Sequence, residues 1–286
     1  MCFFQTFMYL CGLNIKRMKR LKMIRIAVSL LFFATSIAYV IFGTQNILAI
    51  SEELQITTSL LSINIGVIFF WCVVTLLFGR IYCSSACPLG TLQDFMIRLS
   101  HKHLSKRSFR YRHPRNYRYD VVILYIVGSL LSVGIVSLLL EPWQIFRNII
   151  DIWHPSDSEA AALHLGIGIT TGLICGIVSL VLILSLSFFR GRIWCTDVCP
   201  IGIMLGAISS RSRLHIEIDP DKCVNCMACE EECKSECIKV VSRYVDNTRC
   251  IRCFNCIASC PNDAIRYQPN RNKASTPLMR RVKDPT

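Results

Sequence analysis

Two cysteine quartets lie one after the other in the C-terminal part of this 286-residue chain. Each has the spacing C-x2-C-x2-C-x3-C, and the second is followed by Pro261. This spacing is typical of a ferredoxin with two [4Fe–4S] clusters, in which three close cysteines bind one cluster and the fourth binds the other. The spacing therefore predicts two sets of cluster ligands. The first set is Cys223, Cys226, Cys229 and Cys260, and the second set is Cys250, Cys253, Cys256 and Cys233.

Zinc sites and disulfides are the other common uses of closely spaced cysteines. Structural zinc sites usually place two cysteines, a long loop and then two further ligands, which does not fit two uninterrupted quartets. A disulfide framework is typical of secreted chains, whereas cysteines that bind iron must remain available as thiolates. We therefore expect the quartets to lie in a reducing compartment and to bind clusters.

A different cysteine motif occurs twice before the quartets. Segments 79–90 and 191–202 share the pattern G-R-I-x-C-x3-C-P-x-G. On a helix, the C-x3-C spacing would place both thiols of a copy on one face. Three roles are open for these cysteines: a shared metal or iron–sulfur site, a reversible dithiol, or a structural turn beside the ferredoxin. As a hypothesis, they relay electrons or hold a cofactor that does so. The four cysteines are Cys83, Cys87, Cys195 and Cys199.

The other positions of this repeat indicate a membrane surface. Arg80 and Arg192 are placed where a guanidinium could reach lipid phosphates or the edge of an anionic cofactor. Tyr82 and Trp194 fit the aromatic belt of a membrane interface. We therefore expect both copies at the same depth, on the cytoplasmic surface of the membrane.

The elements that must position these motifs are strongly apolar. Hydrophobic residues make up 52% of the chain and charged residues 18%, and the mean hydropathy is +0.44. Soluble domains rarely have this composition. Four stretches are long enough to cross a bilayer as helices, which takes about 20 residues each. They are residues 23–42, 60–78, 121–140 and 163–189.

The segments between these stretches predict one orientation. Segments 16–25 and 79–119 are rich in Lys and Arg, whereas loops 43–59 and 141–162 are mainly acidic. Because basic segments stay on the cytoplasmic side, we expect both termini in the cytoplasm and a multi-pass protein of the inner membrane. The basic run 110–118 would then face anionic lipid, and we expect no nucleic-acid partner.

The sequence therefore predicts an α-helical membrane protein with four transmembrane helices and a small α+β ferredoxin-like domain for two clusters at the C-terminus. Alternation over 213–218 predicts a strand, and short apolar runs follow each quartet. The expected organisation is a basic cytoplasmic segment (1–22), a transmembrane domain with both C-x3-C-P motifs (23–210), a ferredoxin domain (211–268) and a disordered tail (269–286).

Single residues add a few candidates. Cys237 follows the first quartet and is either a spare ligand or a small buried side chain near a cluster. Lys234 stands where the second quartet has its proline. His154 and Trp153 in the outer loop either belong to a quinol-oxidation site that releases protons outward or are ordinary interfacial residues. His164 has no second histidine at a similar depth, so we expect no haem.

Together, the four spans, the two C-x3-C-P motifs and the double quartet resemble the NapH/MauN group of membrane ferredoxins, which is related to the NosR-type and CcoG-type polyferredoxins. The resemblance covers nearly all of residues 20–267. It implies a quinol dehydrogenase component that passes electrons from membrane quinol through [4Fe–4S] clusters to a respiratory partner, such as a ferredoxin, a cytochrome c or a reductase subunit. The CcoG-type relatives imply an alternative: an assembly or maturation factor that reduces a metal or a thiol for another enzyme.

Overall fold

The computed structural model describes most of the helical region and the whole quartet region. The predicted outer loops fall largely outside the described residues, and so do His154, Trp153, His164, the first 14 residues and the C-terminal tail. The described residues are 15–42, 65–103, 109–131, 139–142, 145 and 169–269.

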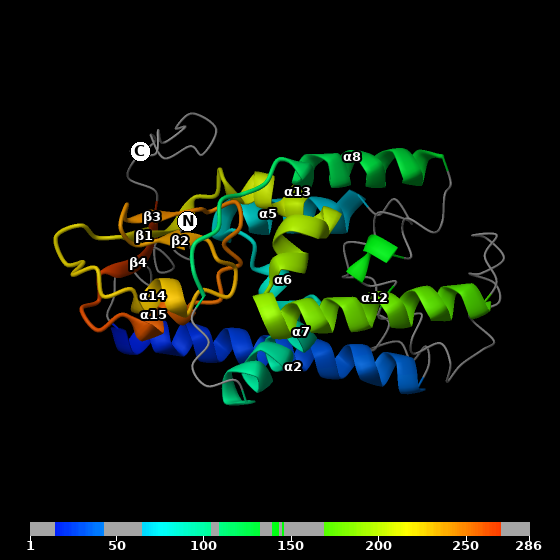
Figure 1. The fold of residues 1–286 in the computed structure, drawn as a ribbon, viewed down its shortest axis with the longest axis horizontal. Coiled ribbons are helices and arrows are strands. Elements are labelled where there is room, and N and C mark those ends of the chain that lie inside the picture. The colour runs from blue at the N-terminus through cyan, green and yellow to red at the C-terminus, as the bar shows by residue number, and fades with distance from the viewer. Residues whose placement is uncertain are drawn as a thin grey trace.

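Four helices overlap the predicted spans in part, and α2, α8 and α12 run roughly along the long axis of the molecule (Figure 1). Among the described residues, one helix is both long and apolar enough to cross a membrane, at 20–38 within α2. Helix α5 and most of α12 are apolar but shorter. A four-span membrane domain therefore stays a prediction. The helices are α2 (Ile15–Phe42), α5 (Ile65–Phe78), α8 (Tyr117–Leu130) and α12 (Ile169–Arg190).

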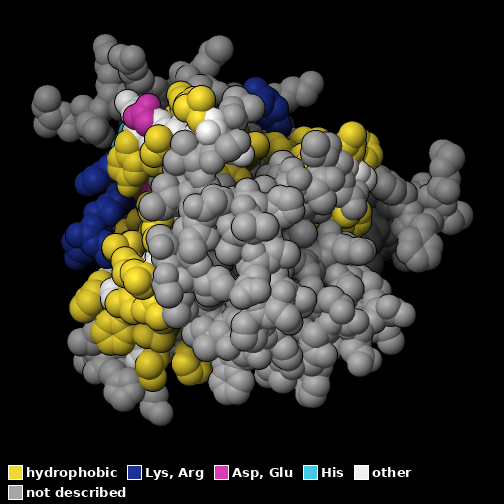
Figure 2. Space-filling view, turned by 90° about the vertical axis from the view of Figure 1, so that its right-hand side faces the viewer, with side chains coloured by type: hydrophobic (Ala, Val, Ile, Leu, Met, Phe, Trp, Pro, Cys, Tyr) yellow, Lys and Arg dark blue, Asp and Glu magenta, His cyan; other side chains and the backbone are white. Residues whose placement is uncertain are grey.

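These helices leave large apolar side chains uncovered. Leu31 of α2, Ile123 of α8 and Val181 of α12 are all more than half exposed. Figure 2 shows hydrophobic side chains along the edge of one face, beside a group of Lys and Arg side chains. Contiguous apolar surface of this kind marks a contact with lipid or with another protein.

The two C-x3-C-P motifs follow α5 and α12 and build equivalent short elements. Gly79 and Gly191 end these helices with positive φ angles of 80° and 70°, a conformation that favours glycine. The motifs continue as α6 (Tyr82–Ser85) and α7 (Pro88–His103) in the first copy, and as a π-helical turn η1 (Trp194–Val198) and α13 (Pro200–Ser209) in the second copy. A proline suits the first helical position because its missing N–H has no partner there anyway.

The quartet region is a small α+β unit, as the sequence predicts. Strands β1 (Leu214–Ile218) and β4 (Ile265–Pro269) pair antiparallel, with Ile216 opposite Tyr267. The second sheet pairs β2 (Ile238–Lys239) with β3 (Tyr244–Val245). The short helices α14 (Ala228–Glu231) and α15 (Asn255–Ser259) each begin after a residue in the left-handed region, Met227 and Phe254. The equivalent turns indicate two related halves.

This unit packs against one end of the helical region (Figure 1). The Tyr267 hydroxyl donates to the carbonyl of Phe78, the last residue of α5, at 2.7 Å. The backbone N–H of Arg213 donates to the Leu76 carbonyl, also at 2.7 Å. Helix α15 contacts α2. The quartets therefore lie directly beside the C-x3-C-P motifs that follow α5 and α12.

Candidate iron–sulfur and cysteine sites

The first predicted ligand set lines one hollow. Its four cysteines line this hollow together with Ile218, Val240 and Ile265. The cysteine from the other quartet, Cys260, comes from the turn after α15 and completes the set. Cys226 is exposed, so this hollow reaches the surface.

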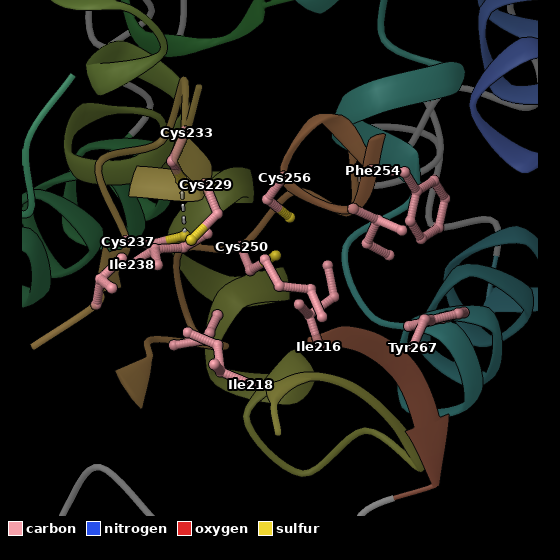
Figure 3. Packing of buried hydrophobic residues seen from close by; sticks show 14 of the residues in the cluster. Ile216, Ile218, Cys229, Cys233, Cys237, Ile238, Cys250, Phe254, Cys256 and Tyr267 are labelled. Atoms are coloured by element: carbon pink, nitrogen blue, oxygen red, sulfur yellow. Dashed lines mark hydrogen bonds between the residues drawn. The ribbon is translucent and has the colours of Figure 1, made fainter. Parts of the chain in front are cut away.

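The second set lines a separate hollow, and three of its four cysteines are buried. Cys250, Cys253 and Cys256 contribute from one quartet and Cys233 from the other. Figure 3 shows how Cys229, Cys233, Cys250 and Cys256 lie among the buried isoleucines of this unit. In both hollows, three cysteines of one quartet thus meet the fourth cysteine of the other.

The donor sets suit a cluster better than a single ion. Among the described residues, no three His, Cys, Asp or Glu side chains converge closely enough to hold one metal ion. A tetrahedral zinc with Zn–S bonds of about 2.3 Å would need its sulfurs within roughly 4 Å of one another. A [4Fe–4S] cluster takes four cysteine thiolates around a larger body. The two hollows, each lined by four cysteines, fit that group.

Cys237 is the fifth thiol beside the second set. Its Sγ lies 3.4 Å from Cys233 Sγ, the contact that is dashed in Figure 3. A hydrogen bond from Cys237 lowers the pKa of Cys250, and the buried guanidinium of Arg252 acts in the same direction. Cys237 is therefore a buried donor next to two predicted ligands.

All four cysteines of the C-x3-C-P motifs come together. Each is about 5% exposed, and the charge of each thiolate would act on the others across the two copies. They do not share one face of a continuous helix, as their spacing suggested. Each chain segment turns between its two thiols, because the second cysteine precedes the proline that begins α7 or α13.

Two arginines link the two copies of the motif, because each donates a hydrogen bond to the opposite copy. Arg80 Nη2 donates to the Cys195 carbonyl at 2.7 Å. Arg192 Nη1 donates to the Cys83 carbonyl at 2.6 Å. Both guanidinium groups are fully buried, so the expected contact with lipid phosphates is wrong. Sequence reasoning missed this role because the partner is a backbone carbonyl more than 100 positions away, which leaves no pattern in the sequence.

The aromatic residues of the motifs are also buried. Tyr82 is 2% exposed and packs edge-on against Trp71 of α5, with 4.8 Å between the ring centroids. Trp194 is 6% exposed. These side chains belong to the core around the cysteines, which corrects the expectation of an interfacial belt. The apolar surface of Tyr82 and Trp194 is buried in the core between the two copies of the motif.

The last glycine of each motif lets the motif fold closely back onto its own first cysteine. A Cβ atom on Gly90 would lie 2.4 Å from the Cys83 carbonyl oxygen, and one on Gly202 would lie 2.1 Å from the Cys195 carbonyl oxygen. Real Cβ atoms do not come so near to an oxygen, so both positions require glycine. A Cβ atom would also lie 3.1 Å from Arg192 at Gly90 and 2.8 Å from Arg80 at Gly202, so these glycines also leave room for the arginine of the other copy.

Asp94 of α7 joins four parts of the molecule. Its carboxylate accepts from Arg192 Nε (2.9 Å), Lys234 Nζ (3.0 Å) and Arg25 Nη1 (3.3 Å). Burial alone would raise the pKa of Asp94, but the three cations bring it well below its ordinary range. One signal could have identified this residue: Asp94 is the single acid in the basic loop 79–119. Lys234, which replaces the proline of the second quartet, belongs to the same network.

Burial argues against a reversible dithiol at the C-x3-C-P cysteines. It raises the pKa of Cys87 to about 12 and that of Cys195 to about 11. Thiol–disulfide exchange requires a thiolate and an accessible sulfur. A coordinated thiol, by contrast, is deprotonated by the metal that it binds. The buried thiols therefore suit a metal or iron–sulfur site or a structural role better than exchange.

Comparison with protein families agrees with the cluster interpretation. A family model described as a 4Fe-4S binding domain matches residues 60–107 and 173–218, each of which contains one C-x3-C-P motif. A second model with the same description matches residues 216–239, which include the first quartet. No solved structure matches the chain.

Several curated proteins are similar to this chain. The ferredoxin-type protein NapH of Haemophilus influenzae is 29% identical over 156 residues, which are 54% of this chain and 47% of that protein. The putative electron transport protein YccM of Escherichia coli is 25% identical over 57% of this chain and 43% of its own length. The methylamine utilization ferredoxin-type protein MauN of Paracoccus denitrificans is 25% identical over 59% of this chain and 53% of its own length. The chain thus spans about half the length of these relatives, and the similarity supports an iron–sulfur electron-transfer protein.

Proposed function

We propose that this chain, a homologue of the NapH and MauN ferredoxin-type proteins, transfers electrons from membrane quinol to a redox partner in the cytoplasm. The first and second cysteine sets would each hold a [4Fe–4S] cluster, which supplies a one-electron carrier when bound. Quinol oxidation releases two electrons and two protons, so single-electron carriers must accept the electrons one after the other. The inner membrane is the proposed location.

The order of the three cysteine sets carries this proposal. The C-x3-C-P cysteines directly follow the C-terminal ends of α5 and α12, which are two of the predicted spans. Cys253 of the second set packs against the buried cluster that contains Cys83, Cys87 and Cys199. The first set lies farther out, where Cys226 is exposed. This order, from the apolar helices to the surface of the ferredoxin unit, supports a path for electrons through the three sets.

The surface end of this path is suited to a protein partner. Val224 is 63% exposed and Met227 is 37% exposed, and both flank Cys226. Apolar side chains beside an exposed ligand allow a partner to exclude water and to bring its own redox centre close. We propose this surface as the exit point for electrons.

Quinol-driven reduction tests the proposal. A menaquinol analogue should reduce the clusters of the anaerobically purified protein. The variants Cys87→Ser and Cys199→Ser should lose this reaction, whereas dithionite should still reduce both ferredoxin clusters because their ligands are intact. Cys175→Ser, in a helix and outside all three sets, is the matched control and should react as the unchanged protein does. Normal quinol-driven rates in both motif variants would show that the motifs are structural turns.

A further inference from the structure

The C-x3-C-P motifs each hold half of a ligand set. A motif contributes two cysteines. Cys83, Cys87 and Cys199 lie in one buried core with Trp71 and Leu89, and Cys195 is equally buried. Iron–sulfur clusters are commonly bound by four cysteines. Each matched segment of the 4Fe-4S family model contains one C-x3-C pair and one further cysteine in the preceding helix, Cys72 or Cys175, so neither has four cysteines. Together the two C-x3-C pairs supply four thiols.

The charge around these thiols is unbalanced. Arg80 is fully buried, and its contacts are the Cys195 carbonyl (2.7 Å), the Thr248 carbonyl (3.0 Å) and Cys83 Sγ (3.7 Å). Its Nε is buried without a hydrogen-bond partner. No carboxylate contacts Arg80 among the described residues. Burying a positive charge without a negative partner is strongly unfavourable. We therefore expect an anion to lie at the thiols beside this guanidinium.

The second copy makes the imbalance clear. Arg192, the equivalent of Arg80, binds the carboxylate of Asp94 at 2.9 Å. At the position equivalent to Asp94, the second motif has Gly206, where a Cβ atom would lie 2.5 Å from the Thr248 carbonyl. The Thr248 carbonyl takes the place of the carboxylate and is neutral. Of the two equivalent arginines, Arg192 thus has a carboxylate partner, whereas Arg80 has none among the described residues.

Two helix N-termini add positive potential at the same place. Helices α7 and α13 begin directly after Cys87 and Cys199. The Gly202 N–H donates to Cys199 Sγ at 3.5 Å, and the Gly90 N–H makes the equivalent bond to Cys87. Helix N-termini favour anions because their first N–H groups are unpaired and the helix dipole is positive there.

The second ferredoxin set provides an internal comparison. Arg252 is fully buried beside Cys250, and its partners are Asn247 Oδ1, Ser212 Oγ and the Leu214 carbonyl, none of them charged. Its Nε is also buried without a partner. The same arrangement, an arginine without a carboxylate next to buried cysteines, therefore occurs where the quartet spacing predicts a cluster.

We propose that the four C-x3-C-P cysteines bind one further iron–sulfur cluster, shared between the two motifs, whose negative charge is balanced by Arg80. Four-cysteine sites hold either a [2Fe–2S] or a [4Fe–4S] cluster. Both are iron–sulfur clusters, which is the class of cofactor that we propose for this site. This inference rests on the proposed function, since the new cluster would stand between the predicted spans and the ferredoxin clusters.

Iron and acid-labile sulfide, counted per chain in the anaerobically purified full-length protein, test the inference. Two ferredoxin clusters account for about eight iron, and a third cluster raises the count to roughly ten or twelve. Cys87→Ser and Cys199→Ser should each lose the same two or four iron, because one cluster is shared. Cys175→Ser should lose none. A count of eight in the unchanged protein overturns the inference without reference to any variant.

Arg80 variants test the charge argument with a spectroscopic readout. Arg80→Gln should lose the third paramagnetic signal of the dithionite-reduced protein, and Arg80→Lys should retain more of it. If Arg80→Gln keeps the full signal, Arg80 does not balance the charge of the cluster, and the role proposed for Arg80 is wrong. A third cluster that quinol fails to reduce would refute the proposed function and leave this inference standing. Quinol-driven reduction of a protein with only eight iron per chain would refute this inference and leave the proposed function standing.

Discussion

At the scale of single residues, Cys237 is the side chain whose role changes most between sequence and structure. From its position alone it is either a spare ligand or a small buried side chain. In the structure it is 1% exposed and lies against Cys233 and Cys250 of the second set. Hydrogen bonds to ligand sulfurs are one of the factors that set the reduction potential of an iron–sulfur cluster. Cys237 therefore has the geometry to tune that cluster.

Replacing Cys237 by Ala should lower the midpoint potential of one cluster. The S–H donor stabilises the more negative, reduced state, and a hydrogen bond contributes about 1 kcal/mol, which corresponds to roughly 40 mV for one electron. A redox titration followed by electron paramagnetic resonance measures the shift. Cys237→Ser keeps a donor and should shift the potential less. If Cys237→Ala instead loses iron, Cys237 is a ligand and the tuning role is wrong.

At the scale of elements, a buried ion network holds the helices to the ferredoxin unit. Asp94 lies in α7, Arg25 in α2, Arg192 directly after α12 and Lys234 beside the first quartet. One carboxylate thus neutralises part of the charge of three cations from distant parts of the chain. Removing it would leave these cations buried without any carboxylate partner in the network.

Asp94→Asn should therefore destabilise the protein by about 3–5 kcal/mol, the usual cost of breaking a buried ion pair from one side. Asp219→Asn is the matched control, because its contact with Arg266 is partly exposed and 3.7 Å long, and it should cost less than about 1 kcal/mol. Unfolding midpoints in detergent compare the two. Equal effects of the two substitutions would mean that the network does not hold the elements together.

The same network predicts a pH dependence. The pKa of Asp94 is lower in the folded protein than in the unfolded chain, so the folded state binds its proton more weakly. The stabilisation is complete above the unfolded pKa of about 3.9 and is lost as the pH falls below it. The difference in stability between the unchanged protein and Asp94→Asn should thus be constant near neutral pH and shrink only in acid.

At the scale of the whole molecule, the described structure separates an apolar helical region from a ferredoxin unit at one end (Figure 1). The basic segment 109–116 runs along that unit: the Phe109 N–H donates to the Glu231 carbonyl and the Arg112 N–H to the Glu236 carbonyl, both at 3.1 Å. The basic central loop and the quartets therefore share one side of the molecule, the side that the charge pattern assigns to the cytoplasm.

Reporter fusions test this orientation. A reporter that is active only in the cytoplasm should work after Gly90 and after Pro269, because both follow segments on the basic side. A reporter that is active only outside should work after Ser51 and after Ser158, in the two acidic loops. An outside signal at Pro269 would contradict the predicted number of spans, and the path of electrons would have to be redrawn.

The sequence by itself determined the cluster ligands that we predict, the α+β type of the quartet region and the apolar helices before each C-x3-C-P motif. These features are local: ligand spacing, alternation along a strand and the length of an apolar stretch are all set by neighbouring residues. The repeat of the C-x3-C-P motif is also visible in the sequence, because both copies retain the same arginine, cysteines, proline and glycines.

Only the tertiary structure decided how the two copies meet. Residues far apart in the chain are joined in three ways: Arg80 and Arg192 each bond to the opposite copy, Cys253 packs against the core that contains C-x3-C-P cysteines, and Asp94 binds three cations. Backbone carbonyls accept many of these bonds, and every residue has one, so their choice leaves no trace in residue types. Burial, which turned two presumed surface arginines into internal charges, follows from the packing of the whole chain and not from any local pattern.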